Sequence, residues 1–373
     1  GAANAAVPSR YFFRISDANL TVNVGVWGDF PSAPRTDLVG NQACNNCHGD
    51  AGIAPHTYKP YDQPSMVASQ CVVCHERKGA YSWIPDSFVG IVHGVHNSHN
   101  MPGGEYEFKA GSTFSVTYPT YMTNCSVCHD TPATLAVANA MPVTGENCFS
   151  CHGSMESWDF TASGTTFHEA YNETTNCQTC HTAGGIAPAT VAEFHNGLAT
   201  ERGGVIWNGV DTSVVEGDKI AMSIDGIVDD GVNLKITWSA KYNGTAVDPC
   251  NATVGPTAPV FHNRTSPSNN LSMLRSYAQG DDFIVGMSTS SPGQPVAVNL
   301  TTTNTVCAAN VATTTIPVDA SRPAGSRGLV ALQGKPQVRF APAAGTNVTT
   351  SSGTSGVPTS VSASTCVPSG EHV

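Results

Sequence analysis

The sequence predicts two architectures in one chain: short helices and loops packed around prosthetic groups, followed by an all-β sandwich or Greek-key domain. Three observations support this prediction. A cysteine-histidine motif recurs five times between residues 41 and 200, where no helical period is sustained. Apolar and polar residues alternate from about residue 205 onward, and only 12% of the 373 residues are charged. This length suits two or three domains.

The first 40 residues contain one strand signal. In LTVNVGVW, Leu20, Val22, Val24 and Val26 alternate with Thr, Asn and Gly, as on a half-buried strand. We expect an N-terminal β segment over residues 1–40. The opening GAANAAVPSR lacks the basic and apolar regions of a signal peptide, so we expect a mature chain whose export signal has been removed.

Ten of the 13 cysteines lie in five copies of the pattern C-x-x-C-H. This is the attachment signature of a c-type haem, in which two thiols form thioethers and the histidine becomes the proximal iron ligand. Structural zinc needs two cysteine pairs per site, and a thioredoxin-like dithiol would occur once in a βαβ context, so neither accounts for five copies. The copies are Cys44, Cys47 and His48; Cys71, Cys74 and His75; Cys125, Cys128 and His129; Cys148, Cys151 and His152; and Cys177, Cys180 and His181.

Five covalently attached haems would supply most of the buried apolar surface of residues 41–200. We therefore expect a multihaem c-type cytochrome module here, made of short helices and loops wrapped on five haems. Attachment of haem by this route takes place outside the cytoplasm, which predicts an exported protein. The cell surface or the extracellular space is the expected location, and the periplasm is less favoured.

The remaining histidines predict the second axial ligands. Eleven of the 13 histidines lie between residues 44 and 195, so six remain there after the proximal ligands are assigned. Imidazole on both sides of each iron suits electron transfer, whereas catalysis needs an open position. Methionine ligation by Met66, Met101, Met122, Met141 or Met155 is the less favoured alternative. The six histidines are His56, His93, His96, His99, His168 and His195; His262 and His372 are expected to have ordinary roles.

The order of these motifs resembles the OmcA/MtrC family of outer-membrane decahaem cytochromes over roughly residues 40–200. The series runs CNNCHGD, CVVCH, VHGVH, YPTYMTNCSVCH, CFSCHGS, FHEAY, CQTCH and VAEFH. The resemblance implies pentahaem modules that alternate with β domains. It also implies that His56, His93, His96, His168 and His195 are the distal ligands, which leaves His99 over. This chain has one pentahaem module ahead of its main β region where the family has two, so the family's porin partner is not carried over.

Residues 201–340 carry several short strand patterns. KIAMSID, VNLKITWS, PVAVNL and GLVALQGKPQVRF alternate or are apolar and are separated by turn residues, which predicts an all-β sandwich or Greek key. Cys250, Cys307 and Cys366 lie outside the haem motifs, so we expect one disulfide and one odd thiol, with the pairing open. Residues 341–373 form a low-complexity C-terminal tail, whose order would need Cys366, packing on the β domain or a neighbouring subunit.

Charge and hydropathy exclude other classes of protein. The net charge is −11 and the 17 basic residues are scattered, which argues against binding nucleic acid or anionic lipid. No apolar run reaches the roughly 18 to 20 residues of a membrane helix.

The leading functional hypothesis is extracellular electron transfer through five bis-histidine haems, with no chemistry at the iron. Other cytochromes or extracellular acceptors, including metals and shuttles, are the expected partners. One alternative is a multihaem oxidoreductase with an open haem, although the active haem of pentahaem nitrite reductases is attached through a motif that ends in lysine. Others are a monomeric cell-surface metal reductase and a subunit of a cytochrome filament (nanowire), in which His99 would be an extra or intersubunit ligand.

Overall fold

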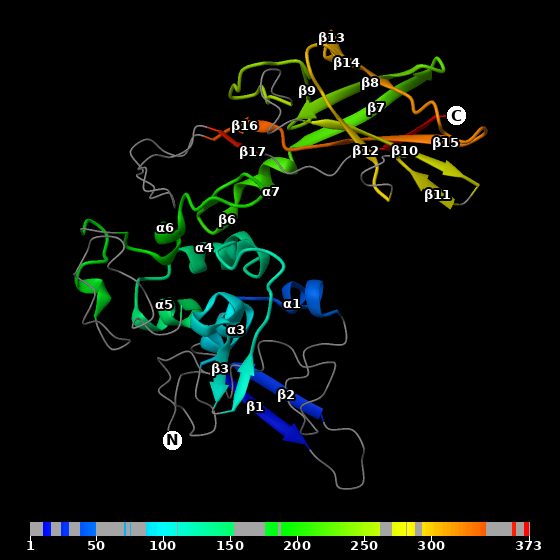
Figure 1. Ribbon diagram of the computed structural model, residues 1–373. Helices are drawn as coiled ribbons and strands as arrows, with labels where there is room; N and C mark the ends of the chain where they lie inside the picture. Colours follow the sequence, from blue (N-terminus) through cyan, green and yellow to red (C-terminus); the bar gives the residue numbers. More distant parts are fainter. Residues whose placement is uncertain are drawn as a thin grey trace. The chain divides into compact units, whose positions relative to one another are not determined.

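The structure, a computed structural model, describes residues 10–15, 24–29, 38–49, 71, 75, 87–109, 111–152, 176–185, 188–261, 271–280, 282–287, 293–340, 360–362 and 369–372. The chain divides into two compact units (Figure 1). The first comprises Gly1–His195 and Asn208–Val210, and the second comprises Asn196–Trp207 and Asp211–Val373.

Short helices and two small hairpins make up the described part of the first unit. One hairpin pairs β1 (Arg10–Ile15) with β2 (Val24–Asp29), and the other pairs β3 (Tyr106–Lys109) with β4 (Ser112–Phe114). Residues 24–27 of the expected N-terminal strand lie in β2, and residues 20–23 lie outside the described residues. The helices are α1 (Asn41–His48), α3 (Phe88–His96), α4 (Pro132–Asn139), α5 (Gly145–His152) and α6 (Val191–His195), with 3-10 turns η1 (Ser98–Asn100), η2 (Pro102–Gly104), η3 (Cys125–Val127) and η7 (Cys177–Thr179).

Local capping explains where two of these helices begin. Ser87 precedes α3, and its Oγ accepts a hydrogen bond from the Gly90 amide at 3.2 Å. Thr131 precedes α4 and forms a reciprocal capping box with Thr134, followed by Pro132 at the first helical position. Because these helices are only eight or nine residues long, their stability depends on packing more than on intrinsic propensity.

The second unit contains two antiparallel five-stranded sheets. One has the order β11-β10-β15-β18, with β12 also paired to β10, and the other has the order β13-β14-β8-β7, with β9 paired to β8. The pairing of β8 with β14 and of β10 with β15 joins strands that are distant in the sequence, as in Greek keys. The strands are β7 (Ile220–Asp229), β8 (Asn233–Tyr242), β9 (Thr245–Val247), β10 (Ser272–Gln279), β11 (Asp282–Val285), β12 (Val296–Asn299), β13 (Thr305–Ala308), β14 (Val311–Pro317), β15 (Arg327–Gln333) and β18 (Ser369–His372).

Smaller elements complete this unit. The paired strands β16 (Gln337–Arg339) and β17 (Ser360–Ser362) form a two-stranded sheet. The short strands β5 (Ile206–Trp207) and β6 (Val210–Asp211) precede α7 (Thr212–Gly217), whose N-cap is the Asp211 carboxylate. Each strand predicted between residues 219 and 340 therefore has a counterpart among β7, β8, β12, β15 and β16.

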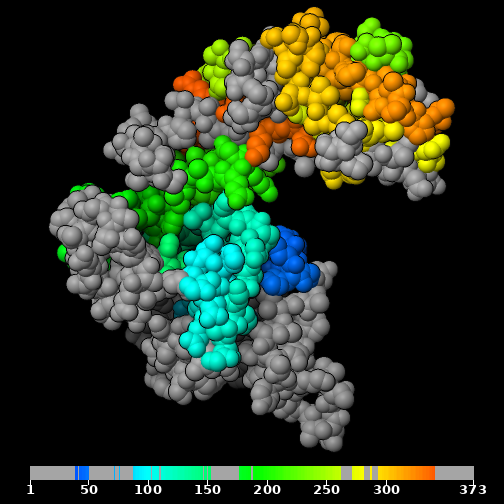
Figure 2. Space-filling model, in the orientation of Figure 1, coloured from blue at the N-terminus to red at the C-terminus, as the bar shows by residue number. Residues whose placement is uncertain are grey.

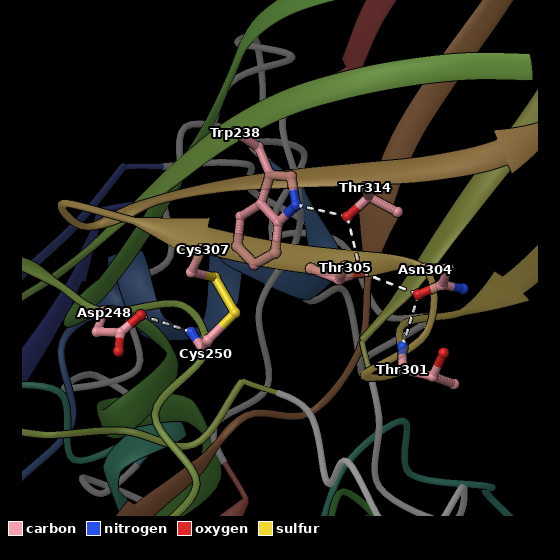
Figure 3. Close-up of a disulfide and its surroundings, with 8 residues drawn as sticks. All are labelled: Trp238, Asp248, Cys250, Thr301, Asn304, Thr305, Cys307 and Thr314. Atoms are coloured by element: carbon pink, nitrogen blue, oxygen red, sulfur yellow. Dashed lines mark hydrogen bonds between the residues drawn. A yellow bond between two sulfur atoms is a disulfide. The ribbon is translucent and has the colours of Figure 1, made fainter.

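One hydrophobic core joins the two sheets into a sandwich. Alternate side chains of β8, among them Leu234, Ile236 and Trp238, pack with Met273 of β10 and Leu332 of β15, and all five are fully buried. The indole N–H of Trp238 donates to Thr314 Oγ1 at 3.0 Å (Figure 3), so the largest buried side chain leaves no unpaired donor. The alternation that predicted the strands is thus the alternation of buried and exposed positions.

Cys250 and Cys307 form a disulfide beside this core (Figure 3), with a Cα–Cα distance of 5.9 Å. The expected disulfide is therefore present, and Cys366 lies outside the described residues. The low-complexity tail contributes β17 and β18, which pair with β16 and β15. Its composition gave no strand signal, because pairing at a sheet edge uses backbone groups and needs few apolar side chains.

Candidate functional site

Each described haem motif forms about one helical turn. The histidine amide donates to the carbonyl of the first cysteine in three motifs, at 3.0 Å for His75, 2.9 Å for His129 and 3.0 Å for His181. The other two motifs are the last turns of α1 and α5. Because residues four apart lie on one face of a helix, the first cysteine and the histidine point the same way. Thioether and imidazole can therefore reach one porphyrin from a single short segment.

The motif cysteines are available for covalent attachment. The nine motif cysteines in the described part of the chain take no part in a disulfide, and Cys74 lies outside that part. Burial raises the pKa of Cys148 and Cys151 to about 11. Zinc ligation and dithiol redox chemistry use thiolates, which form where the pKa is depressed. The environment of these two thiols therefore does not favour either alternative reading of the motifs.

Two histidine pairs have the spacing of axial ligands on a single metal ion. The ring centres of His48 and His96 lie 6.0 Å apart with the planes at 84°, and those of His152 and His195 lie 6.2 Å apart with the planes at 7°. Two imidazoles that face each other across one metal, with bonds of about 2 Å each, have ring centres about 6 Å apart. Each pair joins a motif histidine to one of the histidines left over, so the residues present fit haem iron.

Backbone carbonyls orient four of the imidazoles. The Nδ1 atom of His96 lies 2.7 Å from Val92 O, and that of His195 lies 2.8 Å from Val191 O. His129 Nδ1 is 2.8 Å from Leu38 O, and His181 Nδ1 is 3.2 Å from Pro188 O. Because a carbonyl only accepts, Nδ1 carries the proton and the lone pair of Nε2 remains free for a metal.

Helix α3 presents its two histidines to different motifs. His96 faces His48 of α1, while His93 Nδ1 lies 3.2 Å from Ser150 Oγ of α5. Burial, and then the charges of His129 and His96, lowers the pKa of His93 to about 4. Asn97, at the end of α3, donates from Nδ2 to the Cys151 carbonyl at 2.6 Å and fixes α3 against α5. Figure 2 shows α1, in blue, against the cyan segment that contains α3.

His99, His372 and the candidate methionines lie outside the two histidine pairs. His99 is exposed on η1, where buried Ser98 accepts from the Val116 amide at 2.7 Å and donates to Val95 O at 2.7 Å. Met101 is buried, Met122 and Met141 are partly buried, and the backbone of His372 belongs to β18. The residues that lie outside the described part of the chain are His56, His168, His262, Met66 and Met155.

Electrostatic neighbours reveal which motifs are adjacent. Burial is the main cause of the raised pKa of Cys128 in the third motif, and the charges of Cys44 and Cys47 in the first motif add to it. Burial is also the main cause of the raised pKa of Cys151 in the fourth motif, and the charge of Cys125 in the third motif adds to it. The charge of Cys177 in the fifth motif likewise adds to the raised pKa of Cys148 in the fourth motif. The third motif therefore lies near the first and the fourth, and the fourth lies near the fifth.

Three residues of this site were not predicted from the sequence. Ser150 occupies a variable position of a haem motif, Asn97 follows α3, and Tyr118 packs its ring against His96. None lies in a periodic pattern, and Tyr118 is polar-aromatic in a loop, so only tertiary packing reveals them.

No helix in the described ranges is long and apolar enough to cross a membrane.

Comparison with known proteins finds a family match for residues 36–196. Residues 36–196 match the family model of outer membrane cytochrome MtrC/MtrF-like, domains II/IV. The fold is similar to the crystal structure of MtrC from Shewanella baltica OS185, with a TM-score of 0.52, 16% identity, and coverage of 99% of this chain and 53% of that one. It is also similar to the outer membrane decaheme cytochrome OmcA, with a TM-score of 0.55, 15% identity, and coverage of 99% and 52%.

This chain therefore spans about half the length of each of those two proteins. No curated protein matches it. The resemblance inferred from the order of the motifs is confirmed: residues 36–196 form a domain of the MtrC/MtrF-like outer-membrane cytochrome family.

Proposed function

We propose that this protein transfers electrons through five bis-histidine c-type haems, carried by residues 41–200, to an acceptor outside the cell. The observation that supports this most directly is the spacing of the two histidine pairs, at 6.0 and 6.2 Å between ring centres. An exported, cell-surface protein follows from the route of haem attachment and from the family of residues 36–196. Each bound haem would supply an iron that accepts and releases one electron.

The ligands follow from the paired rings. In this proposal His48 and His96 hold the first haem, and His152 and His195 hold the fourth. The second, third and fifth haems, bound through His75, His129 and His181, would take His56, His93 and His168 in an order that is left open.

The protein's own groups keep these ligands neutral and oriented. Burial lowers the pKa of His152 to about 4 and also lowers the pKa of His195, so neither ring must lose a proton before it binds iron near neutral pH. The carbonyls of Val92 and Val191 hold the rings of His96 and His195 by their Nδ1 atoms. A site with both axial positions filled exchanges electrons and offers no open position to a substrate.

The proposed electron path runs through the first, third, fourth and fifth haems. It rests on the neighbouring thiols of successive motifs, Cys47 with Cys128, Cys125 with Cys151, and Cys148 with Cys177. The second motif, described only at Cys71 and His75, is not assigned a place on this path.

A filament subunit is the second candidate, favoured by one observation. His99 is exposed on η1 and is left over after the distal ligands are assigned, so it is available to a haem of another molecule. Electron microscopy of the native protein decides this point, because discrete particles at all concentrations would exclude a filament.

The proposed function is tested by the haem content and spin state of the purified protein. A haemochromogen assay and intact-mass measurement are expected to give five haems per chain, and the oxidised protein is expected to be low-spin. Fewer than five haems, or mostly high-spin iron, would contradict the proposal. Turnover of nitrite or hydroxylamine would instead favour an oxidoreductase with an open haem.

A further inference from the structure

Tyr118 lies between the ligands of two different haem motifs. Its ring centre is 5.7 Å from that of His96, and the two planes meet at 87°. Burial is the main cause of the raised pKa of its hydroxyl, and Cys128 of the third motif and Cys47 of the first motif, which lie close to it, add to that shift. A single side chain thus touches the distal histidine of the first pair and the attachment turn of the third haem.

This contact constrains the plane of the His96 ring. Edge-to-face packing is the preferred arrangement of two aromatic rings at this distance, so a rotated His96 ring would lose it. The Val92 carbonyl holds Nδ1 of the same ring at 2.7 Å. The planes of His48 and His96 consequently stand at 84°, whereas those of His152 and His195 are nearly parallel at 7°.

We propose that Tyr118 is a positioning residue that holds the His96 ring perpendicular to the His48 ring and ties it to the attachment turn of the third haem. This inference rests on the proposed function and deepens it. The first and third haems are neighbours on the proposed path, so a side chain that joins their ligands fixes their relative position. The phenol ring packs against the His96 ring, and the hydroxyl lies beside Cys128.

The two parts of the side chain can be separated by substitution. Tyr118→Phe keeps the ring beside His96 and removes the hydroxyl from the sulfur, which remains a weak acceptor after thioether formation. Tyr118→Leu removes both contacts. Phe114→Leu is the matched control, because Phe114 is an aromatic side chain of β4 that is 41% exposed.

Low-temperature EPR of the fully oxidised protein is the first readout. Low-spin haems with perpendicular imidazole planes give a signal of larger g anisotropy than haems with parallel planes. The nearly perpendicular rings of His48 and His96 therefore predict one signal of large g anisotropy. We expect Tyr118→Leu to lose or shift this signal for one haem in five, while Tyr118→Phe and Phe114→Leu keep it. All three variants are expected to retain five haems.

A redox titration is the second readout and remains informative if Tyr118→Leu does not fold. Hydrogen bonding and burial around a haem tune its potential, and the Tyr118 hydroxyl belongs to these surroundings. We therefore expect Tyr118→Phe to shift the midpoint potential of one haem and leave the other four unchanged.

The outcomes separate this inference from the proposed function. Five haems with an unchanged EPR spectrum in Tyr118→Leu, or unchanged potentials in Tyr118→Phe, would overturn the role of Tyr118 alone. Fewer than five haems in the wild-type protein would contradict the proposed function itself.

Discussion

At the scale of single residues, the proposed haem ligands are imidazoles that the surrounding protein keeps neutral. The surrounding protein lowers the pKa of His93 and His152 to about 4, chiefly by burial. A lowered histidine pKa favours the neutral form at every pH above it, so these rings keep a free lone pair throughout the neutral range. His99 lies in the same segment as His93 and is exposed.

Replacement of one distal ligand tests this assignment. We expect His195→Ala to convert one haem in five from low-spin to high-spin and to let it bind carbon monoxide, because His152 would be left as its only axial ligand. Added imidazole should restore the low-spin state. EPR and carbon monoxide difference spectra measure both effects. His99→Ala is the control and should stay low-spin, and a fully low-spin His195→Ala protein would refute the pairing.

The spacing of residues predicts the attachment chemistry but not the partners. C-x-x-C-H is a local rule, so the assignment of ten thioether cysteines and five proximal histidines is a prediction that sequence alone can make. The pairing of His48 with His96 joins residues 48 positions apart, and that of His152 with His195 depends on the approach of α6 to α5. No local pattern encodes such contacts, so the structure was needed to propose which ring faces which.

At the scale of elements, a tight turn supports the third haem motif. Asn208 and Gly209 have positive φ angles of 47° and 70°, as the Asn-Gly turn of a hairpin requires. The Gly209 carbonyl accepts from the Ser126 amide at 3.0 Å. A Cβ atom on Gly209 would lie 3.1 Å from Cys125 Sγ and 2.5 Å from Asn139 Oδ1. The turn therefore has room only for glycine beside Cys125.

We expect Gly209→Ala to reduce haem attachment at the third motif. The left-handed backbone costs a residue with a Cβ about 1–2 kcal/mol, and the contact with Cys125 displaces the motif as well. Intact-mass measurement would then reveal chains with four haems. Gly231→Ala is a matched control, because Gly231 has a φ of 85° but nothing within 4 Å of its added Cβ. Equal haem content in the two variants would contradict the supporting role of the turn.

The disulfide is the corresponding constraint in the β sandwich. It joins positions 57 residues apart, so its loss should release a large loop in the unfolded chain and cost about 4 kcal/mol of stability. We expect the double variant Cys250→Ser and Cys307→Ser to unfold at a lower temperature in differential scanning calorimetry, with five haems retained. An unchanged midpoint would show that the sandwich core alone carries the stability of this unit.

At the scale of the whole molecule, sequence reasoning succeeded where side chains form the core. Strands such as β8 and β15 alternate between buried and exposed positions, and that alternation is visible in the sequence. The partners were not predictable, because β8 pairs with β14 and β10 with β15 across long stretches of chain. The first unit has no comparable period, since its described helices have five to nine residues and its proposed core is haem.

A high-resolution experimental structure of the purified, haem-loaded protein tests the central claim most directly. The account predicts one iron bound by Nε2 of His48 and His96 and another bound by Nε2 of His152 and His195. It also predicts that the closest haem edges follow the order of the first, third, fourth and fifth motifs. An iron that joins either proximal histidine to a different ligand, or a first haem that lies nearest to the fifth, would contradict the account.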